Sequence, residues 1–227
     1  MCQGSRKIES QGIRTMNAEE RKRQILEVAK RLFSRNGYYE TQISDIVKAA
    51  DIARGTVYQY FKNKDDIFTT LLDNFYRQWE NAVSTGITGV SIKTIDPVDY
   101  FRHRVRMTLV FFESDREMCN IVLRMGHGLQ RDFESIIRKM EKRIYTLIQG
   151  DLELGIRAGN VRKDLNVELT ANLLDGALLH VAYHYFVHKK NEKAPVDIEK
   201  IAGEITAVFR DGIFTRQASA HAKPQRQ

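Results

Sequence analysis

Residues 54–64 read RGTVYQYFKNK, a stretch with three basic residues and no acidic residue. If it forms a helix, each residue turns the chain by about 100°, so Val57 and Phe61 point in the same direction. They are the only strongly apolar pair in the stretch, and we expect both to face a hydrophobic core. Gly55 and Gln59 point nearly the opposite way. The stretch therefore predicts a short helix with one buried row and one outward row.

The outward row of this helix suits the major groove of DNA. Gly55 would let the backbone approach the base edges, and the Gln59 amide could contact an adenine in bidentate fashion. Arg54 would be free to contact a phosphate or a guanine. The ammonium of Lys64, together with nearby helix-terminal amides, would add a phosphate contact. We expect the two flanking rows to reach the phosphate walls of the groove: Arg54 with Tyr58, and Thr56 with Tyr60.

A second short helix is expected in front of this one. Thr41 is a suitable N-cap, and the following residues form an apolar face at helical spacing: Ile43, Ile46, Val47 and Ala50. Residues 51–53 separate the two helices, which gives a helix-turn-helix pattern. In the alternative interpretation, Tyr58 and Tyr60 are core aromatics with hydrated hydroxyls. That alternative explains neither the preceding helix nor the absence of acidic residues.

Positive charge is concentrated at the beginning of the chain. Residues 1–64 carry 13 Lys and Arg against 7 Asp and Glu, whereas residues 65–227 carry 23 against 22. This asymmetry indicates a small basic module that meets a polyanion, attached to a larger and nearly neutral module. A DNA-compacting protein without sequence preference would need basic charge along the whole chain, so the charge distribution disfavours that class.

The composition is typical of a soluble globular protein. Of the 227 residues, 42% are apolar and 29% are charged, and no apolar run approaches the roughly 18 residues that a membrane span needs. Basic residues near the N-terminus are not followed by an apolar signal region, so we expect a cytoplasmic location. Cys2 and Cys119 have no partner at metal-ligand spacing, and we expect both to be reduced thiols.

Helical spacing continues through the rest of the chain, without strand alternation. Asn17 and Glu20 form a capping box for a first helix that ends near Gly37, and Asn63 caps a long amphipathic helix. Segment 167–188 is apolar on almost all sides, so we expect it to pack against its own domain on one side and against another subunit on the other. We expect an all-α fold of about nine helices. Its predicted parts are a disordered arm over 1–16, a helix-turn-helix DNA-binding domain over 17–64, a connecting helix over 65–86, a larger helical domain over 87–215, and a disordered tail over 216–227.

The DNA-binding segment resembles a known family. Residues 37–68, GYYETQISDIVKAADIARGTVYQYFKNKDDIF, are similar to the N-terminal domain of the TetR family of bacterial transcriptional regulators. The resemblance covers residues 17–64 and is specific, whereas the remainder is similar only in its helical pattern and length. It implies three DNA-binding helices, a linking helix and a regulatory domain over 87–215 that binds a ligand and dimerises through its last two long helices.

Two positions in the turn depart from the family pattern. Asp51 replaces the usual glycine, and aspartate tolerates the left-handed conformation better than most residues. Ala53 replaces the serine that usually caps the recognition helix, which removes a hydrogen bond worth about 1 kcal/mol. Base preference is therefore open, although DNA binding is still expected. By the same likeness, further DNA contacts are expected from Thr41, Gln42 and Ser44, and an arm contact from Arg14, Arg21 and Lys22, for which a solvated role is equally open.

Histidines at 180, 184 and 188 recur every four residues. His180 and His184 form an HxxxH pair that could chelate a metal from one helix face, so a metal-dependent enzyme is the rival hypothesis. Val181 stands where a metalloprotease has glutamate, and the general base is missing. Interior or interface histidines are the favoured interpretation, and His188 in the last turn suits the helix dipole. We expect no bound metal, no cofactor and no enzymatic activity.

The family likeness places an effector pocket among the middle helices. A mostly apolar pocket with few polar groups would suit a hydrophobic or aromatic small molecule. The candidates put polar atoms among apolar ones, and a plain core or surface role stays open for each: His103, Met107, Phe111, Arg124, His127, Tyr145 and His184.

These inferences predict a homodimeric repressor that binds double-stranded DNA at a near-palindromic operator and is released by a small-molecule effector. The two recognition helices would enter successive major grooves about 34–36 Å apart. Effector binding would shift the dimer toward a state with the wrong spacing. No role at a membrane is expected.

Overall fold

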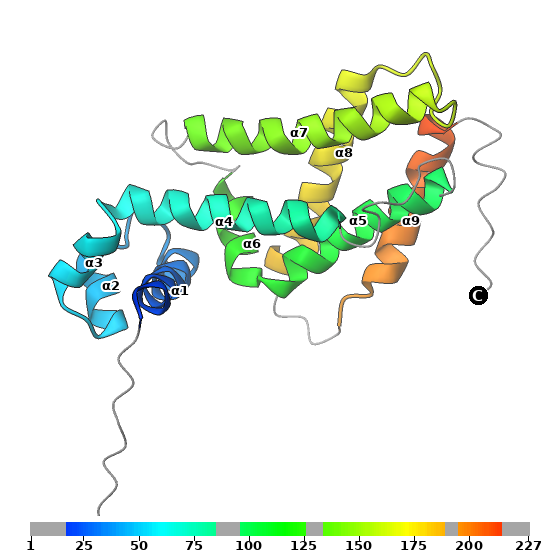
Figure 1. Cartoon of the computed structure of the whole chain (residues 1–227). Helices are drawn as coiled ribbons and strands as arrows, with labels where there is room; N and C mark the ends of the chain where they lie inside the picture. The colour runs from blue at the N-terminus through cyan, green and yellow to red at the C-terminus, as the bar shows by residue number, and fades with distance from the viewer. Residues whose placement is uncertain (1–16, 85–95, 126–133, 189–194, 215–227) are drawn as a thin grey trace, which may run out of the picture.

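The described part of the chain is all-α, as predicted (Figure 1). The computed structural model describes residues 17–84, 96–125, 134–188 and 195–214. The predicted arm, tail and most of the linker after the connecting helix lie outside these ranges. Within them no strand forms, and the one isolated bridge joins Val161 to Phe214. None of the helices in these ranges has the length and hydrophobicity that a membrane crossing requires.

Nine α-helices and one short π-helix make up the described residues. In chain order they are α1 (Ala18–Asn36), α2 (Ile43–Ala50), α3 (Arg54–Tyr60), α4 (Lys64–Ser84), α5 (Pro97–Ser114), α6 (Arg116–Met125), α7 (Glu134–Arg157), α8 (Val167–Ala182), the π-helix η2 (Tyr183–His188) and α9 (Ile198–Ile213).

The predicted capping box begins α1. Asn17 Oδ1 accepts from the Glu20 N–H at 2.8 Å, and Glu20 Oε2 accepts from the Asn17 N–H at 2.9 Å. The helix ends at Gly37, whose φ of 90° requires a residue without a side chain. Its N–H donates to the Phe33 carbonyl at 3.0 Å. Both ends of α1 are therefore fixed by local sequence.

A left-handed residue makes the turn between α2 and α3. Asp51 has φ 53° and ψ 53°, and it is the only described residue other than glycine with a positive φ. The N–H of Ile52 then donates to the Val47 carbonyl at 3.3 Å, which closes α2. Aspartate adopts the conformation that glycine would take more easily. Asp51, which stands where the family pattern has glycine, thus adopts the left-handed conformation that this turn needs.

The long helix α4 connects two groups of helices. It begins beside α3 and extends into the larger group formed by α5 to α9 (Figure 1). Asn63 Oδ1 accepts from the Asp66 N–H at 2.8 Å, which is the predicted cap. Buried residues along α4 belong to one continuous core, from Phe68 near α1 and α3 to Trp79 near α5. Helices α1–α3 and the larger group of helices α5–α9 therefore share one hydrophobic core.

The larger segment is built from pairs of packed helices. α5 packs against α9, and α7 packs against α8. Side-chain caps fix three of the helix starts, because Asp96, Asn166 and Asp197 each accept a backbone N–H from the first turn. The predicted helix over 167–188 changes to π-helical pairing at Tyr183. Segments of this kind occur often at functional sites.

Two polar contacts join α1 to α6 and to Asp115, the residue before it. Lys30 Nζ lies 3.0 Å from Asp115 Oδ2, and its side chain is only 13% exposed. Hydrogen bonds and charge from Asp115 raise the pKa of Lys30, although burial opposes them. Nearby, the Asn120 side-chain amide donates to the Ser34 carbonyl at 2.8 Å. Helix α1 is thus held to the larger group of helices at a second place besides α4.

Candidate nucleic-acid interface and internal cavity

The outward row of α3 is open to solvent. Val57 and Phe61 are 0% and 2% exposed and face the core, as the helical pattern predicts. Gly55 lies opposite, where an added Cβ would meet no other atom within 4 Å, and Gln59 is exposed. Tyr58 is 47% exposed, so its ring is not a core aromatic. The row can therefore approach another molecule closely.

The two flanks of α3 differ in exposure. Arg54 Nη2 donates to the Tyr58 hydroxyl at 3.3 Å, and the guanidinium carbon lies 5.7 Å from the centre of the tyrosine ring. This contact holds both side chains together on an exposed flank. On the other flank Thr56 and Tyr60 are half-buried. Ala53 precedes α3 and makes no side-chain capping hydrogen bond, because its methyl group cannot accept one.

The Lys64 ammonium is turned into the protein. Its Nζ donates to the carbonyls of Tyr38 and Thr41, each at 2.9 Å, and lies 4.2 Å from the centre of the Tyr38 ring. Burial lowers the pKa of Lys64, opposed by the carboxylates of Asp65 and Glu40. This differs from the prediction that the ammonium faces a phosphate. The cause is tertiary: the α1–α2 connection presents its carbonyls to the first residue of α4.

Thr41 is buried and does not cap α2. Its side chain is 0% exposed, and its hydroxyl donates to the Gly37 carbonyl at 2.8 Å. The residue before the helix is Gln42, whose N–H donates to the Asp45 carboxylate at 2.8 Å. Gln42 and Ser44 are exposed. The predicted cap is therefore wrong by one residue, and the Thr41 hydroxyl is not available to a phosphate.

The basic residues of the predicted arm contact are partly engaged within the protein. Lys22 Nζ lies 5.9 Å from the Phe61 ring centre, and Arg21 Nη1 donates to Gln24 Oε1 at 2.6 Å. The Gln24 amide in turn donates to the carbonyl of Ala50 at the end of α2, at 2.9 Å. Arg14 lies outside the described residues.

A cavity of about 130 Å³ lies in the larger segment. On this measure one water molecule needs about 10–15 Å³, so the space suits a small organic group. Its walls come from α4, α5, α7 and α8, together with the bridge region after α7 and the end of α9, and they are mainly apolar. Six of the larger apolar side chains in these walls are Phe75, Trp79, Phe101, Phe112, Leu147 and Leu178.

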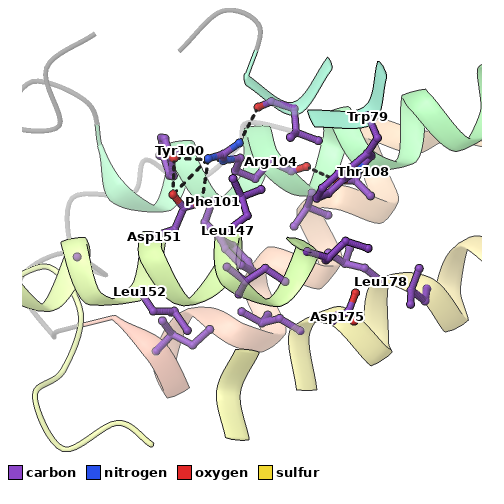
Figure 2. Close-up of a pocket in the computed structure, with 18 of the residues that line it drawn as sticks. Trp79, Tyr100, Phe101, Arg104, Thr108, Leu147, Asp151, Leu152, Asp175 and Leu178 are labelled. Atoms are coloured by element: carbon purple, nitrogen blue, oxygen red, sulfur yellow. Dashed lines mark hydrogen bonds and ion pairs between the residues drawn. The ribbon is translucent and has the colours of Figure 1, made fainter. Parts of the chain in front are cut away.

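Three polar residues in the cavity wall, Tyr100, Arg104 and Asp151, form hydrogen bonds and an ion pair with one another (Figure 2). Arg104 Nη2 lies 3.1 Å from Asp151 Oδ2, and Arg104 Nη1 donates to the Val83 carbonyl at 3.1 Å. The Tyr100 hydroxyl accepts from Arg104 Nε at 3.1 Å and donates to Asp151 Oδ1 at 2.9 Å. The charges of Arg104 and Asp151 therefore compensate each other.

A second set of polar groups in the wall is unpaired among the described residues. The indole N–H of Trp79 is buried and has no hydrogen-bond partner there. Asp175 also lines the cavity, and burial raises the pKa of its carboxyl to about 6, with a smaller effect from the Glu141 charge. Figure 2 shows Asp175 apart from the Arg104–Asp151 network. The cavity thus has one satisfied and one unsatisfied polar region.

Comparison with known proteins identifies the family. Residues 25–71 match the family described as "Bacterial regulatory proteins, tetR family". The chain is 30% identical over 190 residues to an uncharacterised HTH-type transcriptional regulator, YhgD of Bacillus subtilis, and the match covers 81% of this chain and 92% of that protein. The chain belongs to the TetR family. It is a DNA-binding transcriptional regulator of the helix-turn-helix type, as the resemblance of its α2–α3 segment implied.

Solved structures agree with this fold. The FadR regulator of Bacillus subtilis in complex with stearoyl-CoA superposes with a TM-score of 0.68 at 20% identity, covering 84% of this chain and 98% of that one. AibR in complex with isovaleryl coenzyme A and operator DNA gives a TM-score of 0.66 at 19% identity, covering 83% and 97%. At this identity the likeness establishes the all-α TetR-family fold.

The pocket residues expected from the sequence of this TetR-family regulator lie away from this cavity wherever the structure describes them. Of the seven candidates, the six that the structure describes are not among the residues that line the cavity: His103, Met107, Phe111, Arg124, Tyr145 and His184. His127 lies outside the described residues. On α5 the residues that line this cavity include the next position after three of the candidates, namely Arg104, Thr108 and Phe112. Phe111 instead packs against Phe75, with ring centres 4.8 Å apart.

The histidines at the end of α8 are not gathered into a metal site. The rings of His184 and His188 stack with centres 6.1 Å apart, and His180 is exposed. Within the described ranges no three His, Cys, Asp or Glu side chains are placed to hold a metal ion. The free Cys119 is buried, and burial raises the pKa of its thiol to about 12.

Proposed function

We propose that this regulator is a homodimeric repressor that binds a near-palindromic operator in double-stranded DNA and leaves it when a hydrophobic effector fills the internal cavity. The observation that supports the proposal is the placement of α4. Phe68 on α4 belongs to the same core as Val57 and Phe61 beneath the recognition helix, and Trp79 on α4 lines the cavity. One helix therefore takes part in both sites.

At the operator, α3 would be the recognition helix. We assign base reading to Gln59 beside Gly55, because this row is open and its backbone can approach the groove. Phosphate contacts are assigned to the flanks, Arg54 with Tyr58 and Thr56 with Tyr60, and to Gln42 and Ser44 at the start of α2. Two such helices in a dimer would enter major grooves about 34–36 Å apart.

The dimer surface is assigned to α8 and α9. Leu169 and Leu173, one turn apart on α8, are 56% and 55% exposed, and Val208 on α9 is 78% exposed. Exposed Gly176 on α8 and Gly212 on α9 have free space where a Cβ would stand, which would allow close helix approach. Apolar side chains on two helices, exposed in one chain, are what a two-fold interface would cover.

The mainly apolar walls of the cavity favour an effector with a hydrophobic part. Two structural relatives were solved with molecules that carry an acyl chain, stearoyl-CoA in FadR and isovaleryl coenzyme A in AibR. Acyl thioesters are therefore the first effectors to test. Loss of operator binding would follow if the effector favours a state in which the two recognition helices have the wrong spacing.

The test combines operator selection with effector release. Genomic fragments bound by the protein would be sequenced, and fluorescence anisotropy of a labelled operator would be followed against a panel of acyl thioesters. We expect at least one compound to lower operator affinity. A Leu178→Phe variant, which fills part of the cavity, should bind DNA as before but lose the response. Release that persists unchanged in this variant would place the effector elsewhere, and a panel without effect would reject acyl thioesters.

A further inference from the structure

Three side chains in the cavity wall have unused hydrogen-bonding capacity. The Trp79 indole can only donate, and its buried N–H has no partner in the described part of the chain. Tyr76, one turn before it on α4, is 8% exposed and lines the same cavity. Across from α4, the Asp175 carboxylate on α8 makes no hydrogen bond with another described residue. Buried polar groups of this kind are normally satisfied.

The charge in this part of the cavity is negative. Burial raises the pKa of the Tyr76 hydroxyl, and the charges of Asp175 and of Glu141 on α7 raise it further. Burial also raises the pKa of the Asp175 carboxyl, with a smaller effect from Glu141. The only cationic side chain among the described lining residues is Arg104, and Asp151 already neutralises it. An anionic group placed here would meet Asp175 without a compensating cation.

Arg104 is also poorly suited to anchor a carboxylate. Three of its nitrogens are engaged by the Tyr100 hydroxyl, the Val83 carbonyl and Asp151. An incoming carboxylate would have to displace Asp151 and leave that carboxylate unpaired, which costs free energy at a half-buried site. Neither polar region of the cavity therefore offers a ready place for a negative group.

We propose that Asp175, Tyr76 and Trp79 form a subsite for a hydrogen-bond-donating group, most favourably a cation, carried on an apolar effector. An amine would donate to Asp175, and a hydroxyl could in addition accept from the Trp79 indole. The inference rests on the proposed effector role of the cavity and favours a different chemical class from the simple acyl thioesters: the part that enters is apolar with an amine or hydroxyl, and it is not a carboxylate.

The single tryptophan of the chain makes the test direct. Trp79 is the only tryptophan in the sequence and lines the cavity, so its fluorescence reports occupancy. The probes are decylamine, decan-1-ol and decanoate, which share one chain length, used below micelle-forming concentrations at about pH 7.5. At this pH Asp175 is mostly ionised, given the carboxyl pKa of about 6. We expect decylamine to bind at least about tenfold more tightly than decanoate, with decan-1-ol between them.

A charge-removing variant separates the subsite from general hydrophobic binding. Asp175→Asn should weaken decylamine binding about tenfold and tighten decanoate binding. The difference in affinity between the two probes should therefore shrink or change sign. Glu168→Gln is the matched control, because Glu168 is an exposed carboxylate in the first turn of the same helix. It should leave the order of the three probes unchanged.

The possible outcomes distinguish the subsite from the effector cavity. If none of the three probes changes Trp79 emission, the cavity does not take an apolar molecule and the proposed effector site fails together with the subsite. Tight binding of decanoate, equal to that of decylamine in the parent protein, would overturn the subsite while leaving the effector cavity intact. If the three probes bind to Asp175→Asn with the same order of affinities as to the parent protein, the subsite is likewise overturned and the effector cavity is left intact.

Discussion

At the scale of single residues, the row of α3 that faces outward separates base reading from positioning. Gln59 is exposed and lies beside Gly55, whereas Tyr58 is held on a flank by Arg54. A side chain that reads a base edge affects some operators more than others, and one that contacts a phosphate affects all of them alike. The two classes can be told apart by mutation.

We expect Gln59→Ala to cost about 1–3 kcal/mol of binding free energy at the base it contacts and to relax preference there. Tyr58→Phe should weaken binding by a similar factor on every operator variant, because only its hydroxyl is lost. Anisotropy titrations against operators with single base-pair changes measure both effects. If Gln59→Ala lowers affinity equally on all variants, Gln59 does not read a base.

Lys64 is expected to stabilise the DNA-binding segment. Lys64→Met keeps the aliphatic stem but removes the ammonium that binds the Tyr38 and Thr41 carbonyls. Leaving these carbonyls unsatisfied should lower the free energy of unfolding by about 1–3 kcal/mol, measured by urea denaturation at fixed protein concentration. Lys62→Met, at an exposed neighbouring position, is the control. Equal stability of the two variants would contradict the role assigned to Lys64.

Asp175 gives a pH-dependent prediction. Its folded-state carboxyl pKa of about 6 lies above the ordinary value of 3.8, so the charged form opposes folding above about pH 6. This cost disappears as the pH falls toward the ordinary pKa. Asp175→Asn should therefore raise the free energy of unfolding by about 1–3 kcal/mol at about pH 7.5. Denaturation at about pH 4.5 should show a smaller gain, and a gain that grows on acidification would contradict the raised pKa.

At the scale of helices, the sequence predicts core faces and most caps because they depend on near neighbours, and the cap of α2 is the exception. The Asn17–Glu20 capping box, the Asn63 cap and the buried Val57–Phe61 pair are all confirmed. Long-range contacts account for what the pattern misses. Helical spacing locates a face of α5, but only the positions of α4 and α7 decide that Thr108 faces the cavity. The inward turn of Lys64 likewise depends on the α1–α2 carbonyls.

The α2–α3 turn can be tested through Asp51. Because its φ is 53°, Asp51→Gly should remove left-handed strain of about 1 kcal/mol, partly offset by the greater flexibility of glycine in the unfolded chain. We expect a small net rise in unfolding free energy and no change in operator affinity. Calorimetry and anisotropy measure the two quantities. A loss of stability would mean that the Asp51 side chain contributes more than its backbone conformation costs.

At the scale of the whole molecule, the exposed apolar surface of α8 and α9 should control DNA binding through assembly. Leu173→Glu and Val208→Glu place charges on a surface that is exposed in one chain, so each monomer should still fold. We expect sedimentation to show dissociation and operator affinity to fall more than tenfold, because a monomer reaches only one half-site. Lys163→Gln, at an exposed position outside α8 and α9, serves as the control. A monomeric variant that binds the full operator normally would rule out this interface.

The length of α4 sets how far a small change at the cavity is carried. Its 21 residues span about 31 Å, with Trp79 near one end and Lys64 at the other. Lys64 lies about 22 Å from Trp79 along the helix axis, so a tilt of about 8° at Trp79 would move Lys64 by about 3 Å, close to the rise of one base pair, about 3.4 Å. Because the Lys64 ammonium binds carbonyls of the α1–α2 connection, the recognition helix α3 would move together with this end of α4. An effector that tilts α4 by about 8° would then displace each recognition helix by nearly the rise of one base pair.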